Sequence, residues 1–267
     1  MNISLAKLWK PFFKILPHHP YVLKQCRRYC NVYLGENEGD MKDNGELFFV
    51  NQHIRDCQVV FDVGANEGDW TNHILRMNPS VQVHCFEPSP SIFLKLKERV
   101  RSPSVQFVPF GLSGKDEELE FFHVGYSLYK RIGDHHVDQS HSAIETVALT
   151  TLSGYMERNK LDCVDFVKMD IEGHELQALK GGLNEFRLGR IKRLYFEYNT
   201  TFIDAGIFLK DIFMLFKNLD YRIYKLMPDH LQRVEAYDNR LENFQFKHFG
   251  LVHRSIPETG VERMLEL

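Results

Sequence analysis

One stretch decides the fold of this chain: residues 59–70, which read VVFDVGANEGDW. Four of its first five residues are apolar, which suits a strand that is covered on both faces of a sheet. Gly64 and Gly68 follow this strand and permit backbone conformations and close approaches that a side chain would block. The stretch therefore predicts a buried strand, a glycine-bearing turn and a helix, with a ligand at the carboxyl end of the strand.

The turn lacks the residues that bind a dinucleotide. A dinucleotide fingerprint needs glycine at its first, third and sixth positions, where this chain has Gly64, Asn66 and Asp69. The lysine-containing ending of a phosphate-binding loop is also absent. The acidic residues Asp62, Glu67 and Asp69 would repel a pyrophosphate, so a ligand with cationic groups fits better. S-adenosylmethionine carries a sulfonium, an ammonium and a carboxylate, and we expect its binding residues to include Asp62, Gly64, Asn66 and Gly68.

Residues 81–88, VQVHCFEP, predict the next strand, which ends at Glu87. The spacing from Gly68 to Glu87 suits a strand-helix-strand unit. An acid at this position can accept hydrogen bonds from two ribose hydroxyls, and we assign that role to Glu87 over the alternative of a solvated strand-end carboxylate. A third strand over 105–110 ends in the small-residue loop 111–113, and Ser113 joins the expected donor site.

The remaining pattern alternates strands and helices and predicts a seven-stranded sheet. Apolar and β-branched runs at 119–124 and 145–149 indicate an inserted hairpin or edge pair. The other expected strands cover 164–173, 193–199, 221–227 and 244–252, and the expected helices cover 88–100, 152–159, 174–182 and 207–219.

The strand expected over 164–173 leads into the acidic sequence DIEGHE, residues 170–175. Asp170 and Glu172 are two positions apart on a strand, so their carboxylates share a face. Transfer of a group to a hydroxyl benefits from a base, and we expect Glu172 or His174 to act as base or to orient the acceptor, with Asp170 lining the donor site. For Glu175 we favour a structural role at the N-terminus of the following helix.

Composition limits the class of protein. The 267 residues, 43% hydrophobic, are enough for one sizeable core. The net charge of -3 gives no general electrostatic reason to bind nucleic acid. Five cysteines without a Cys-x-x-Cys pair indicate neither a disulfide framework nor a zinc site, and a reducing cytoplasm is the simplest compartment. No run of eighteen apolar residues occurs, so we expect a soluble chain.

The N-terminal residues have an amphipathic pattern of their own. Apolar residues recur at helical spacing over residues 1–16, while Lys7, Lys10 and Lys14 fall mostly on another side. We expect this segment to pack on the catalytic domain or on a partner subunit of a homo-oligomer. Contact of residues 1–16 with a membrane surface is the less favoured alternative.

Three motifs together resemble the FkbM-type S-adenosylmethionine-dependent methyltransferases. They are DVGANEG at 62–68, FEP at 86–88 and KMDIEGHELQALKG at 168–181, and the last resembles the family signature Lys-x-Asp-x-Glu-Gly-x-Glu-x-x-x-Leu-x-Gly. The resemblance spans Asn44 to His253 and implies an α/β, Rossmann-like class I methyltransferase fold, with a mostly parallel seven-stranded sheet flanked by helices. It also implies methyl transfer to a hydroxyl of a sugar, glycan or natural-product acceptor. We expect residues 1–43 to form a helical extension and residues 44–267 the methyltransferase domain.

Three other functions stay open at this point. Asp170, Glu197 and Asn199 could converge as oxygen ligands for Mg²⁺, although we favour a site without metal. A nicotinamide-dependent oxidoreductase would use the same architecture, but the missing glycines speak against it. A Rossmann-like binding module without activity is the third alternative, and the acids at three strand ends favour catalysis over it.

Overall fold

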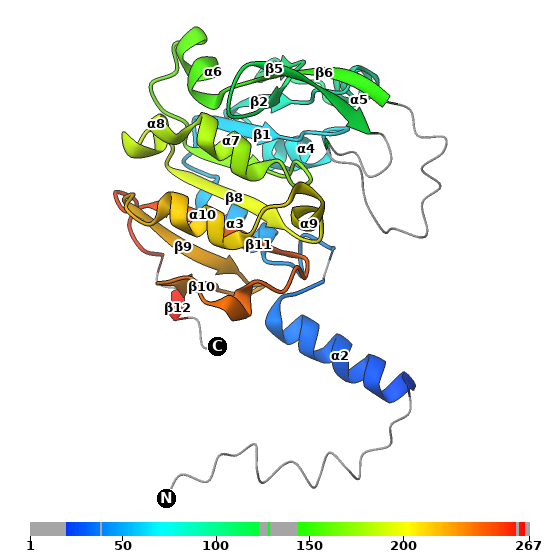
Figure 1. Ribbon diagram of the computed structural model, residues 1–267. Coiled ribbons are helices and arrows are strands. Elements are labelled where there is room, and N and C mark those ends of the chain that lie inside the picture. Colours follow the sequence, from blue (N-terminus) through cyan, green and yellow to red (C-terminus); the bar gives the residue numbers. More distant parts are fainter. Residues whose placement is uncertain (1–19, 38, 123–127, 129–143, 260–261, 265–267) are drawn as a thin grey trace, which may run out of the picture.

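The structure is a computed structural model, and it describes residues 20–37, 39–122, 128, 144–259 and 262–264 (Figure 1). Within these residues the chain forms a nine-stranded sheet in the order β12-β10-β9-β11-β8-β7-β1-β2-β3. Helices cover both faces of this sheet, so the molecule has three layers.

Five strands of the sheet run parallel and set the position of any site. They are β3 (Val105–Val108), β2 (Gln82–Phe86), β1 (Val59–Val63), β7 (Phe166–Met169) and β8 (Arg193–Tyr198). The strand order reverses between β1 and β7, because β2 and β3 lie on one side of β1 and the later strands on the other. Ligands of open α/β sheets bind at such a reversal, beyond the carboxyl ends of the strands.

The other edge of the sheet is mainly antiparallel. Strand β11 (Lys247–His253) runs antiparallel between β8 and β9 (Tyr221–Leu226). Strand β10 (Leu231–Val234) pairs antiparallel with β9, and β12 (Glu262–Met264) pairs parallel with β10. The α/β class with a mainly parallel sheet is confirmed, but the sheet gains β10 and β12 beyond the seven strands expected.

Alternating side chains of each strand build a separate core on each face of the sheet. In β1, Val60 packs in one core, and Phe61 and Val63 pack in the other. The first core is closed by α3 (Glu46–His53), α4 (Asp69–Met77) and α5 (Pro90–Arg99). The second is closed by α6 (Leu152–Arg158), α7 (Glu175–Gly181), α8 (Leu183–Arg187), α9 (Thr201–Ala205) and α10 (Leu209–Phe216), and a short 3₁₀ helix, η2 (Asn239–Leu241), precedes β11.

A small second sheet lies beside the main one. It consists of β4 (Gly111–Leu112), β6 (Ile144–Thr150) and β5 (Glu117–Phe122), in the order β4-β6-β5. Strands β5 and β6 pair antiparallel, which confirms the inserted strand pair.

The largest difference in length concerns the strand before the acidic turn. The strand expected over 164–173 ends at Met169, because the chain turns at Glu172 and Gly173, whose φ angles are 54° and 99°. The helix expected over 174–182 is confirmed as α7, which ends at Gly181, but the separate helix α8 that begins at Leu183 was not expected.

Helix α2 (Pro20–Leu34) stands clear of the three layers and has no buried residue (Figure 1). The segment 1–16, for which we expected packing on the domain or a partner, lies outside the described residues. In the part of the chain that the structure covers, no helix combines the length and apolar character that crossing a membrane requires.

Candidate active site

The glycine turn after β1 is shaped by the protein's own backbone. Gly64 has a φ of 79°, and a Cβ there would lie 1.9 Å from the carbonyl oxygen of Asp170, where the turn crosses the end of β7. Gly68 has a φ of 88°, and a Cβ there would lie 2.2 Å from Val100 beside α5. Both positions require glycine, and the close approach that requires it is between parts of this chain.

A buried lysine joins the turn to the neighbouring strand. Lys168 Nζ lies 3.3 Å from Asp62 Oδ1 and 3.5 Å from Asp170 Oδ2, and it donates to the Gly64 carbonyl at 2.9 Å. Burial lowers the pKa of Lys168, but Asp62 and Asp170 more than offset it and hold the pKa above its usual value. Asp62 is fully buried and also accepts a hydrogen bond from Thr71 Oγ1 at 2.6 Å. Its carboxylate therefore binds both Lys168 and the side chain of Thr71 in α4.

Glu87, at the end of β2, is held against the glycine turn. Its Oε2 accepts the backbone N–H of Asn66 and its Oε1 that of Ser89, both at 3.0 Å. Burial raises the pKa of Glu87 to about 7, against the lowering effect of these two N–H groups. Each carboxylate oxygen keeps a lone pair for a further donor.

The turn after β7 places its acids in a constrained backbone. Glu172 adopts a left-handed conformation, which is uncommon for a residue with a side chain. At Gly173 a Cβ would lie 2.8 Å from the carbonyl oxygen of Thr201 in α9, so this position also requires glycine. Such conformations persist only where the surroundings enforce them, and they concentrate at functional sites.

His174 is buried and belongs to a hydrogen-bonded chain. Ser113 Oγ donates its single proton to Glu117 Oε1 at 2.7 Å, so it accepts from His174 Nε2 at 3.0 Å. Burial lowers the pKa of His174 to about 4, although Glu117 acts in the opposite direction. The imidazole is therefore neutral near pH 7 and carries its proton on Nε2.

Glu175 has the local role expected of it. Its Oε1 accepts the backbone N–H of Ile171 at 3.0 Å, which closes the turn before α7. Burial raises the pKa of Glu175 to about 8, so the carboxyl is neutral near pH 7 and acts as a hydrogen-bonding cap more than as a charge.

Three carboxylates converge beside the β7 turn. Oxygens of Asp170, Glu172 and Glu197 lie within 4.8 Å of one another. Burial and then the like charges of Asp170 and Glu172 raise the pKa of Glu197 well above its usual value, and Asn199 donates a hydrogen bond to Glu197. The expected trio for a cation was Asp170, Glu197 and Asn199, and the structure brings Glu172 into that place. Oxygens of this kind suit a hard cation, which would have to overcome the burial and like charges that raise the pKa of Glu197.

A cavity of about 380 Å³ opens where these strands end. Six of the residues expected in the site line it: Gly64, Asn66, Glu87, Asp170, Glu172 and His174. Three others do not line it. Asp62 and Ser113 contact the lining residues Lys168 and His174, and the backbone N–H of Gly68 donates to the carbonyl of the lining residue Ala65 at 2.9 Å.

The sequence analysis missed two parts of the lining. An apolar part contains Ile92 from α5, Leu112, Phe121 and Leu149 from the second sheet, and Leu128, which lies between β5 and β6 in the sequence. The opposite part contains Met41, Glu46 and Trp70, and Glu46 is held there by a hydrogen bond from the Tyr195 hydroxyl. Trp70 lies within the stretch that decided the fold, but nothing in the local pattern around Glu46 indicated a site.

The strand order, the reversal at β1 and β7, and the acid-lined cavity define the chain as a Rossmann-like protein of the class I methyltransferase type. The family described as "Methyltransferase FkbM domain" matches residues 62–223. The chain belongs to the FkbM methyltransferase family, and it is a methyltransferase.

Two relatives with assigned activities are similar to this chain. The hexuronic acid methyltransferase AglP of Haloferax volcanii is 30% identical over 184 residues, which cover 67% of this chain and 70% of AglP. The 2-O-methyltransferase NoeI of Sinorhizobium fredii is 22% identical over 156 residues, which cover 53% of this chain and 63% of NoeI.

Solved structures resemble the chain only at the level of overall shape. The plantazolicin methyltransferase BpumL, in complex with SAH, has a TM-score of 0.42 and 8% identity, with 90% of this chain and 92% of that chain covered. A precorrin-6y C5,15-methyltransferase from Geobacter metallireducens has a TM-score of 0.41 and 8% identity, with 77% and 86% covered.

Proposed function

We propose that this chain transfers a methyl group from S-adenosylmethionine to a hydroxyl of a sugar-containing acceptor. One observation carries the proposal: β1, β2 and β7 bring the glycine turn, Glu87 and Asp170 to one cavity. The acids of this cavity complement a sulfonium and an ammonium, and the turn offers backbone N–H groups to a carboxylate.

For the donor, we assign the ribose hydroxyls to Glu87, whose two oxygens are oriented by backbone N–H groups. The turn at Gly64 and Asn66, with Asp170 opposite, then receives the methionine part. Asp62, Gly68 and Ser113 act on the donor through the residues they support.

For the acceptor, we assign the general base to Glu172 in preference to His174. The methyl carbon is already activated by the sulfonium, so the protein has to align the hydroxyl and accept its proton. Glu172 lines the cavity next to Asp170. His174 also lines it, but its pKa of about 4 makes it a weak base, and its Nε2 is committed to Ser113.

The acceptor class rests on the relatives. Both carry names that assign methyl transfer, one of them to hexuronic acid, a sugar acid, and the other to a 2-O position, and a sugar acceptor methylated on an oxygen agrees with both names. The net charge of -3 gives no reason to expect a nucleic acid acceptor. Five cysteines, all free, are consistent with the reducing cytoplasm that we propose as the compartment.

The experiment combines binding and turnover. Calorimetry should show binding of S-adenosylmethionine, and incubation with a panel of saccharides should yield S-adenosylhomocysteine and a product heavier by one methylene unit. Binding of NADH without binding of S-adenosylmethionine would overturn the proposal.

Glu172→Gln separates the two halves of the site. We expect it to leave the donor dissociation constant within about twofold and to slow turnover by at least about 100-fold, the size typical of a lost general base. Glu157→Gln removes the same charge from the exposed surface of α6 and serves as the control. An unchanged rate in Glu172→Gln would remove Glu172 from this role.

A further inference from the structure

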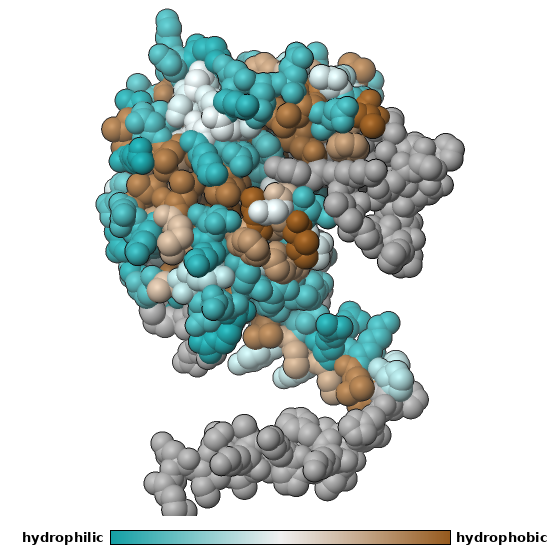
Figure 2. Space-filling view, viewed as in Figure 1, coloured by the Kyte–Doolittle hydropathy of each residue, from teal (hydrophilic) through white to brown (hydrophobic). Residues whose placement is uncertain are grey.

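Helix α2 exposes large apolar side chains that the main body does not cover. Figure 2 shows α2 clear of the body, and its residues Leu23, Tyr29, Tyr33 and Leu34 are 55%, 73%, 76% and 46% exposed. Hydrophobic residues scattered singly on a surface need no explanation, but a contiguous set on one element indicates an interaction site.

The residues of α2 divide into two faces. Successive residues of an α-helix lie about 100° apart, so one arc of about 140° collects most of the apolar residues. This arc holds Val22, Leu23, Cys26, Tyr29, Cys30, Tyr33 and Leu34. The other side holds Lys24, Arg27 and Arg28 together with Tyr21 and Val32, and α2 contains no acidic residue. A helix with a continuous apolar face and an opposite face whose charges are all positive is typical of segments that lie in a membrane interface.

The sequence around α2 is also more positively charged than the rest of the chain. The first 35 residues contain six Lys and Arg and no Asp or Glu, whereas the remaining residues contain 27 Lys and Arg against 36 Asp and Glu. The net charge of -3 for the whole chain therefore conceals a cationic N-terminal region on an acidic body.

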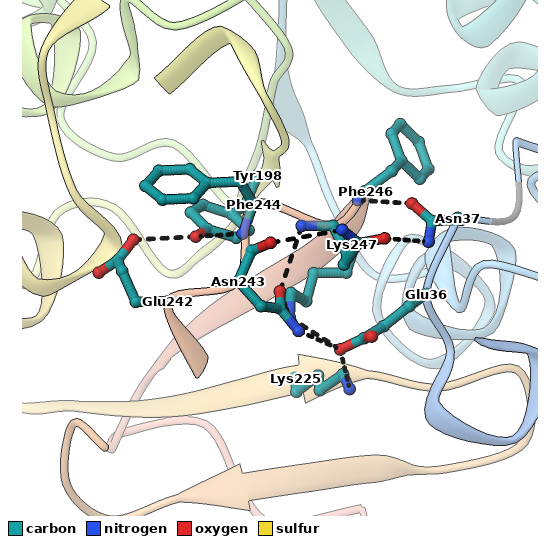
Figure 3. A network of polar contacts seen from close by, with 10 residues as sticks. Glu36, Asn37, Tyr198, Lys225, Glu242, Asn243, Phe244, Phe246 and Lys247 are labelled. Carbon is teal, nitrogen blue, oxygen red and sulfur yellow. Dashed lines mark hydrogen bonds and ion pairs between the residues drawn. The ribbon is translucent and has the colours of Figure 1, made fainter. Parts of the chain in front are cut away.

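A buried joint fixes the C-terminal end of α2 to the sheet (Figure 3). Glu36 follows the helix and is buried, and its Oε1 accepts hydrogen bonds from Lys247 Nζ at 2.9 Å and Asn243 Nδ2 at 3.1 Å. Lys225 Nζ lies 3.5 Å from the same oxygen. Gly35, with a φ of 61°, turns the chain between helix and joint, and a Cβ there would lie 2.8 Å from Met227 Sδ. The helix is thus held at one end while its faces stay exposed.

We propose that α2 binds the surface of an anionic membrane. The apolar face enters the boundary between headgroups and acyl chains, where tyrosine rings are favoured, and the three cations of the other face lie among lipid phosphates. A second copy of the chain suits this surface less well, since pairing two copies of α2 gathers six cations and supplies no acid from either helix.

Vesicle flotation with the full chain tests this proposal. We expect binding to vesicles of phosphatidylcholine mixed with phosphatidylglycerol, weaker binding to phosphatidylcholine alone, and loss of the difference at high salt. Lys24→Gln, Arg27→Gln and Arg28→Gln together should weaken binding to the anionic vesicles by about 100-fold, since each cation near the surface contributes about a factor of five.

Matched variants separate this effect from a general loss of charge. Arg187→Gln, Lys210→Gln and Lys217→Gln together remove the same charge from exposed positions of the main body and should leave binding unchanged. Leu23→Ser with Leu34→Ser should weaken binding to both kinds of vesicle. Because the altered α2 side chains are exposed, both α2 variants should keep the wild-type melting temperature.

Three results would overturn the proposal. One is equal flotation with the two kinds of vesicle, and another is undiminished flotation of the variant that lacks the α2 cations. The third is a dimer in sedimentation that Leu23→Ser with Leu34→Ser converts to a monomer, because that result would assign the apolar face to a second copy.

Discussion

Affinity for the donor should fall as the pH decreases through 7, because Glu87 has to be ionised to hold the ribose. Burial raises the pKa of Glu87 to about 7 in the free protein, so the carboxyl is mostly ionised at pH 8 and mostly protonated at pH 6. If only the ionised form accepts both hydroxyls, the apparent dissociation constant should rise about tenfold over this range, equivalent to about 1.4 kcal/mol.

The assay must exclude titration of the ligand. S-adenosylmethionine has an α-amino group that itself ionises near pH 8. 5′-Methylthioadenosine keeps the adenine and ribose and lacks the amino acid part, so calorimetry with this probe isolates the ribose end. Repeating the titration in buffers of different ionisation enthalpy should show release of about half a proton at pH 7 and nearly one at pH 6.

Glu87→Gln is the matched control for this measurement. The amide cannot ionise, so we expect weaker binding at pH 8 and a nearly flat pH profile. A flat profile in the wild-type protein, or the same slope in Glu87→Gln, would refute the assignment of the ribose to Glu87.

Three further predictions concern the site and its supports. Gly64→Ala should lower the free energy of unfolding by at least about 4 kcal/mol, because its Cβ would meet the Asp170 carbonyl. Gly206→Ala, also at positive φ but in open space, should lower it by about 1 kcal/mol, and equal losses of the two variants in urea unfolding would contradict this. Between pH 5 and 8 the wild-type protein should lose a few kcal/mol of unfolding free energy relative to Glu175→Gln, because folded Glu175 keeps its proton up to a pKa of about 8 whereas the unfolded chain loses it near 4.5. Curves of unfolding free energy against pH that run parallel for the two proteins would contradict this. EDTA should leave methyl transfer unchanged, and loss of activity that Mg²⁺ restores would assign a metal to the carboxylate cluster.

The convergence of the glycine turn, Glu87 and Asp170 on one cavity could be predicted because its signals are local. The glycine turn follows a buried strand directly, and Glu87 and Asp170 stand at the ends of strands that their own apolar patterns reveal. Parallel strands end at one edge of a sheet, so the order of elements alone brings these residues together.

The supporting contacts could not be predicted because they join distant parts of the chain. Asp62 reads as a strand-end acid in sequence, yet it pairs with a lysine 106 positions later and stays behind the cavity. Ser113 meets His174 across 61 positions. Glu46 lies before the part of the chain that matches the family, and only the packing of α3 beside Tyr195 brings it to the cavity.

Strands β10 and β12 could not be predicted from the sequence for a different reason. Strand β10 has four residues, and β12 has three, which pair with β10 at the edge of the sheet as far as the described residues show. Segments this short have too few residues to show an alternating pattern, and they form because β9 already offers an edge.

The joint at Glu36 also determines when α2 becomes fixed during synthesis. Its partners Lys225 and Lys247 lie 189 and 211 positions further along the chain. Helix α2 leaves the ribosome before these partners, so the carboxylate that anchors it stays without its lysines until β11 has emerged. The newly made chain therefore carries an unanchored cationic helix while the whole sheet up to β11 is synthesised, and the joint closes only after that.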